Sequence, residues 1–75
     1  MGYRFTVIMT PETDPDFKGY YNAVVPTLPG CFSYGASREE ALHNVREAIL
    51  LYVEDLKLSG EPVPEEEISQ VEVTV

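Results

Sequence analysis

The residues from Ser37 to Leu58 constrain the fold most, because they form a long stretch without proline or glycine. Ser37 followed three residues later by Glu40 matches the capping box, in which the serine hydroxyl and the glutamate carboxylate each accept a backbone N–H at the helix start. Gly60 with Pro62 behind it is the expected stop at the other end. The sequence therefore predicts one helix of about six turns.

The helical period divides this segment into two apolar zones. The wider zone is expected to lie on a sheet, and its members are Ala41, Leu42, Val45, Ile49, Tyr52, Val53 and Leu56. Leu51 and Leu58 fall outside it, one heptad apart, on an outer stripe that also carries Glu40, Glu47 and Glu54. Because two leucines on an acidic ridge exceed the needs of a core, we interpret Glu47, Leu51, Glu54 and Leu58 as a candidate partner-binding stripe.

The rest of the chain has the alternating pattern of strands. Strands are predicted at residues 3–9, 20–25, 31–34 and 70–75, and the last of them is expected to point Val71, Val73 and Val75 inward. The fold class predicted is α+β, a single β-β-β-α-β domain over residues 1–75 with one helix packed on a mostly antiparallel sheet.

The charge of the chain restricts its partners. The formal net charge is −8, and the five basic residues are scattered, so direct nucleic-acid binding is disfavoured. An acidic surface serves solubility and also suits a basic protein partner. The first nine residues, MGYRFTVIM, form a stretch that is too short and too polar for a secretory signal. No stretch of about 18 apolar residues, as a membrane-spanning helix needs, is present. We therefore expect a soluble, cytoplasmic protein without a membrane segment.

Small size favours self-association. A domain of 75 residues buries only about 60% of the surface of its unfolded chain, and the single cysteine excludes an internal disulfide. We therefore expect a homo-oligomer, either a dimer or a tetramer. A second candidate surface for it is the sheet face opposite the helix, expected to carry Ile8, Tyr20 and Val24 beside Arg4, Thr6 and Asn22.

The residues that could perform chemistry do not form a catalytic pattern. Cys31 lies beside a turn, but the only histidine, His43, is on the helix side opposite the packing face, so a Cys–His pair is not expected. Glu12, Asp14 and Asp16 lie together in a loop without the spacing of a calcium site, and they define a less favoured alternative, a remnant metal-dependent nuclease. We predict no catalytic residue, no metal ligand and no cofactor.

Three segments in this order resemble one family. They are residues 20–31 with their Leu-Pro-Gly-Cys turn, residues 34–48 at the helix start, and residues 60–64, and together they are similar to HicB-like antitoxins. The resemblance implies a partial ribonuclease H-like fold and binding to a small, basic, mRNA-cleaving toxin of the HicA type. It also implies structural roles for Pro29, Gly30, Cys31, Gly35, Ser37, Glu40, Ala41, Gly60 and Pro64.

The sequence departs from the family pattern at two points. Many members carry a DNA-binding segment after the fourth strand, and because none follows here, operator binding is not expected. Ala36-Ser37 replaces the usual Asp-Thr, which keeps the helix cap and loses one carboxylate. A purely structural homo-oligomer without a toxin partner stays open as an alternative.

Overall fold

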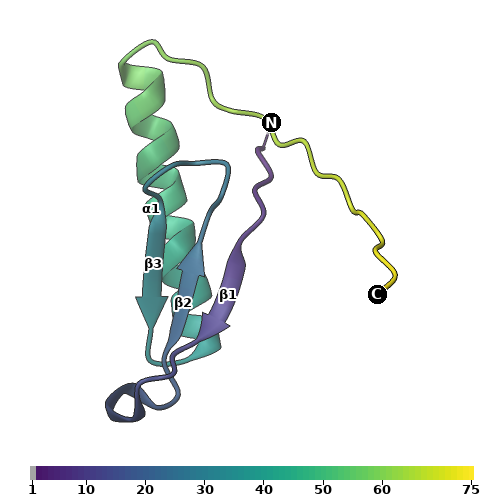
Figure 1. The fold of residues 1–75 in the computed structure, drawn as a ribbon. Helices are drawn as coiled ribbons and strands as arrows, with labels where there is room; N and C mark the ends of the chain where they lie inside the picture. The colour runs from purple at the N-terminus through teal and green to yellow at the C-terminus, as the bar shows by residue number, and fades with distance from the viewer. Residues whose placement is uncertain (1) are drawn as a thin grey trace.

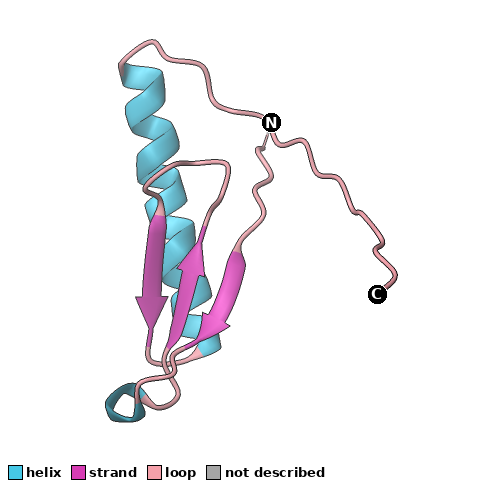
Figure 2. Ribbon diagram, viewed as in Figure 1, coloured by secondary structure: helices cyan, strands magenta, loops and turns pink. Residues whose placement is uncertain are grey.

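Three antiparallel strands followed by one long helix make up the fold, which confirms the α+β class (Figure 1). The computed structural model describes residues 2–75. The helix covers one face of the sheet and leaves the other open (Figure 2). In sheet order the strands are β1 (Ile8–Pro11), β2 (Tyr21–Val24) and β3 (Phe32–Gly35), followed in sequence by α1 (Arg38–Leu58), and a short 3-10 helix, η1 (Pro15–Phe17), lies in the β1–β2 connection.

Strand β1 begins at Ile8, later than the alternating pattern predicts. The register pairs Ile8 with Val24, so Thr6 would face Pro26, which has no N–H to donate to a ladder. The ladder therefore stops where β2 turns away. The side chains of residues 5–9 still alternate, and the half-buried ones that pack against the core are Phe5, Val7 and Met9.

Both ends of α1 follow the predicted capping. The Ser37 hydroxyl accepts the Glu40 N–H at 3.1 Å, and the Glu40 carboxylate accepts the Ala36 N–H at 3.0 Å, one residue before the cap. At the other end, Gly60 has a φ of 73° and donates its N–H to the Lys57 carbonyl at 3.1 Å. A positive φ there is the conformation that glycine adopts without strain, so the helix stops at this point.

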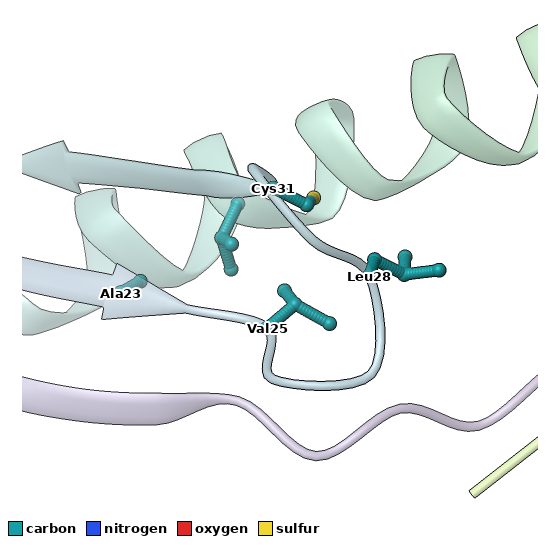
Figure 3. Close-up of a cluster of buried hydrophobic side chains, with 5 residues drawn as sticks. Ala23, Val25, Leu28 and Cys31 are labelled. Atoms are coloured by element: carbon teal, nitrogen blue, oxygen red, sulfur yellow. The ribbon is translucent and has the colours of Figure 1, made fainter.

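The core is formed mainly by the connection between β2 and β3 (Figure 3). This loop folds back on itself: Val25 donates its N–H to the Cys31 carbonyl at 3.0 Å, and Cys31 donates to the Leu28 carbonyl at 2.9 Å. The fold directs Leu28, which is completely buried, toward the interior. A loop thus supplies side chains that pack against Val45 of α1.

The predicted fourth strand is wrong for this structure. After α1, residues 61–75 form no strand, and the chain leads away from the sheet on the β1 side (Figure 1). The carboxylate of Glu66 accepts the Thr6 N–H and, at 2.8 Å, the Thr6 hydroxyl. In the register of β1 with β2 the Thr6 N–H points toward Pro26, so Glu66 binds it where the ladder to β2 has ended. The valines expected to face inward are exposed: Val71 by 82%, Val73 by 72%, and Val75 fully.

Candidate protein-binding surface

The predicted stripe lies on the outer side of α1, away from the sheet. Leu51 is 67% exposed and Leu58 is 84% exposed, and Glu47 and Glu54 between and beside them are exposed as well. Neither leucine is part of the buried core, so neither is explained by folding of this chain alone. With acids along this side, neither α1 nor any other helix within residues 2–75 is long and apolar enough to cross a membrane.

A hollow of about 450 Å³ adjoins the stripe between α1 and the start of β3. Leu51 and Tyr52 line it from the helix, and Phe32 lines it from the strand. Leu51 is exposed at this hollow, so an apolar side chain of a partner could contact it together with the ring of Tyr52. The sequence analysis did not identify Phe32, although its position next to buried Cys31 in an alternating strand was the available signal.

The open face of the sheet carries a second apolar row. Ile8, Val24 and Phe32 lie opposite one another across the three strands and are 50%, 46% and 65% exposed. The predicted second surface is therefore present at Ile8 and Val24, but Tyr20 does not join it. Its ring packs edge to face against Phe17 of η1, with centroids 5.5 Å apart, because the connecting loop folds beside the strand end.

Several residues of the resembling segments bring the β2–β3 loop and the helix together. The Tyr52 hydroxyl donates to the Pro29 carbonyl at 2.9 Å. Gly35 ends β3 directly against the first turn of α1, where a Cβ atom would lie 2.4 Å from the N atom of the fully buried Ala41. Farther along the chain, Pro64 is half-buried. The contacts of these residues set the position of α1 on the sheet.

Cys31 and His43 are far from forming a catalytic pair. Cys31 is buried in the core, and its burial raises the pKa of the thiol because the charged thiolate is disfavoured away from water. His43 is exposed on the other side of α1. Burial and a raised pKa describe a packing cysteine and not an activated nucleophile.

The loop acids support the local structure. Glu12 accepts hydrogen bonds from the Asn22 amide and the Thr13 N–H, both at 3.0 Å, and these bonds lower its pKa, with the Asn22 bond as the largest cause. Asp14 caps η1 by accepting the Asp16 N–H at 3.0 Å. Within residues 2–75, no cluster of three histidine, cysteine or acidic side chains could hold a metal ion.

Comparison with known proteins places the same residues in a family. A family model described as "HicB_like antitoxin of bacterial toxin-antitoxin system" matches residues 6–75. A UPF0150 protein of Thermoplasma acidophilum is 43% identical over 70 residues, which cover 93% of this chain and 96% of that protein. A UPF0150 protein of Synechocystis is 44% identical over 66 residues, which cover 88% of this chain and 78% of that protein. A UPF0150 protein of Helicobacter pylori is 54% identical over 51 residues, which cover 68% of this chain and 69% of that protein. No solved structure matches the chain significantly.

Proposed function

The chain belongs to the HicB-like antitoxin family of bacterial toxin–antitoxin systems, and from this premise we propose that it binds a HicA-type, mRNA-cleaving toxin and blocks it by protein–protein contact. A family of antitoxins implies a toxin as partner. The outer stripe of α1, consisting of Glu47, Leu51, Glu54 and Leu58, is the proposed docking surface. Because a toxin that cleaves mRNA acts in the cytoplasm, we infer that the protein acts there too.

The exposed leucines of the stripe are the observation that carries the proposal. Leu51 and Leu58 are 67% and 84% exposed on a rigid, capped helix, and Leu51 adjoins the hollow lined by Phe32. An apolar centre that loses water on binding slows dissociation of a complex, and a rigid helix loses little conformational entropy. These groups supply the desolvated part of the interface.

The acidic residues of the stripe supply the complementary charge. A toxin that binds mRNA presents a positive surface to the phosphate backbone, and carboxylates that cover this surface compete with RNA. Glu47 and Glu54 flank Leu51 on the same side of the helix, in a chain of net charge −8. This arrangement steers a basic partner toward the leucines. The protein then acts by covering the toxin and performs no catalytic step of its own.

Binding kinetics with a purified HicA-type toxin test the proposal. Leu51→Ala is expected to speed dissociation, with a loss of about 1–3 kcal/mol for a leucine buried in the complex. Glu47→Lys combined with Glu54→Lys is expected to slow association and to flatten its dependence on salt. Cleavage of RNA by the toxin should recover in parallel with the loss of binding.

The connector after α1 offers the matched control. Glu65 is exposed and lies outside the stripe, so Glu65→Lys changes the net charge by the same amount per residue without touching the proposed surface. If Glu65→Lys slows association as much as either stripe reversal, net charge alone steers the partner and the stripe is not the docking surface. Unchanged toxin binding by all stripe variants contradicts the proposal directly.

A further inference from the structure

A second surface of the molecule lies on the other flank of α1. An open groove with a volume of about 1080 Å³ runs between residues 2–7 and the helix. Its walls are largely apolar, with Phe5 and Val7 on one side and Leu42, Ile49, Leu50 and Val53 on the other. Leu42 and Leu50 are 41% and 57% exposed there. The expectation that Leu42 packs on the sheet is therefore wrong, because α1 packs over β3 and β2 and leaves this flank of the helix uncovered.

The groove is basic in a chain that is otherwise strongly acidic. Three of the five basic residues of the chain, Arg4, Arg46 and Lys57, line it, and Glu54 is the only acid among its lining residues. The Lys57 ammonium lies 5.1 Å from the centre of the Tyr3 ring, which holds this cation at the groove. An occupant of this site is therefore an apolar segment that also carries negative charge.

The C-terminal segment of the chain, residues 68–75, has these properties. Its valines at alternate positions are exposed, and Glu72 lies between two of them. If the segment lay along residues 2–7 as a strand with the valines toward α1, its even-numbered residues would share the other face with Arg4. Glu72 and Arg4 would then form an opposite-charge pair on neighbouring strands. The valines therefore fit the apolar walls of the groove, and the charge of Glu72 fits Arg4 at its rim.

The segment does not enter the groove of its own chain. Glu66 is bound to Thr6 of the same protomer, and the residues after it lead away from the domain (Figure 2). Eight extended residues reach about 26 Å, enough to lie along a neighbouring molecule. An exchange between two copies keeps the Glu66–Thr6 contact in each protomer and fills both grooves symmetrically.

We propose that the chain dimerises by strand exchange, in which residues 68–75 of each copy pair with residues 2–7 of the other and insert Val71 and Val73 into its groove. The segment and the thirteen residues that line the groove give each protomer about twenty interface residues. A standard stable interface has about this number on each side. Of the stripe residues only Glu54 also lines the groove, so Glu47, Leu51 and Leu58 stay free and this inference does not depend on the toxin.

Light scattering over a range of concentrations tests the proposal with the full chain alone. The expected mass is twice 8.4 kDa at micromolar concentration. Val73→Asp places an unpaired carboxylate in the groove and is expected to raise the dissociation constant of the dimer more than about 100-fold. Thr74→Asp adds the same charge to the opposite face of the segment and is expected to leave the dimer intact. The helical signal in circular dichroism should remain unchanged in both, because the segment lies outside the core.

Two neighbouring leucines of α1 provide an independent pair of variants. Leu50→Asp changes the groove wall and is expected to give a monomer, whereas Leu51→Asp changes the outer stripe and is expected to leave the dimer intact. Dissociation by Leu51→Asp alone would overturn the proposal and move self-association to the stripe. A monomer at all concentrations, with Val73→Asp lowering the free energy of unfolding, would overturn it by showing that the segment fills its own groove.

Discussion

The hydroxyl of Tyr52, in the middle of α1, donates a hydrogen bond of 2.9 Å to the carbonyl of Pro29, at the tip of the connection between β2 and β3. The two residues are 23 positions apart in sequence. The contact joins the helix to the loop that also supplies Leu28 and Cys31 to the core. This side-chain hydrogen bond therefore adds to the backbone hydrogen bonds that hold the loop on which the core depends.

Tyr52→Phe is expected to lower the free energy of unfolding by about 0.5–1.5 kcal/mol, the usual net contribution of such a bond. The aromatic ring stays half-buried, so packing is preserved. Tyr34→Phe is the matched control, because its side chain is 62% exposed on the open face of the sheet. Urea denaturation of the three proteins measures the difference. An equal loss in both variants would mean that the Tyr52–Pro29 bond contributes nothing specific.

Gly35→Ala is expected to destabilise the protein by about 1–3 kcal/mol or to prevent folding, because the backbone of Ala41 cannot move aside as a flexible side chain can. An added Cβ would lie 2.4 Å from the backbone N atom of Ala41. Gly2→Ala makes the same chemical change where nothing lies within 4 Å, and it should leave stability unchanged. Thermal unfolding of the two variants provides the comparison. Equal melting temperatures would show that α1 can move away from β3 without loss.

Local patterns predicted the helix and strands β2 and β3 well, and β1 only in part. The cap at Ser37 and the stop at Gly60 depend on residues next to them in sequence, so the bounds of α1 follow from the sequence alone. The start of β1 depends instead on Pro26 in the neighbouring strand, which the alternation of residues 3–9 does not contain. The prediction of a fourth strand was wrong for a similar reason. Alternation predicts which face of a strand is apolar, but it does not predict which edge of the sheet the strand joins.

The candidate surface was predictable only in part. The helical period identified Leu51 and Leu58 as outward-facing, and both are exposed. It could not show that Leu50 is 57% exposed on the other flank, because this depends on how far the sheet extends below the helix. The sequence pattern also could not predict that Arg4, Arg46 and Lys57 lie around one groove, since these residues come from two distant segments.

Cys31 is expected to react slowly with a disulfide reagent at mildly alkaline pH while the protein is folded. The thiol is 5% exposed, and burial raises its pKa, so little of the reactive thiolate is present or accessible. Ser59→Cys adds an exposed thiol directly after α1 as an internal reference. We expect one fast and one slow phase in this variant, and a single fast phase in urea. Two fast phases under folding conditions would contradict the buried position of Cys31.

The bond between Glu12 and Asn22 is expected to make stability depend on pH in the acid range. Hydrogen bonds from Asn22 and from backbone N–H groups lower the pKa of Glu12 in the folded protein, relative to an unfolded value of about 4.3. The ionised carboxylate therefore contributes stability that is present above the unfolded pKa and is lost as the pH falls through the folded pKa.

Glu12→Gln tests this dependence, because it keeps the shape of the side chain and removes its titration. The free energy of unfolding of the variant should be lower than that of the unchanged protein at pH 7, and the difference should shrink as the pH falls from about 5 to about 3. Glu61→Gln, at an exposed position after α1, is the control and should show a smaller difference at pH 7. A difference between Glu12→Gln and the unchanged protein that stays constant over this range would show that ionisation of Glu12 does not contribute to stability. The loop between β1 and β2 would then be held by the Glu12 N–H, which donates to the Tyr20 carbonyl at 2.8 Å.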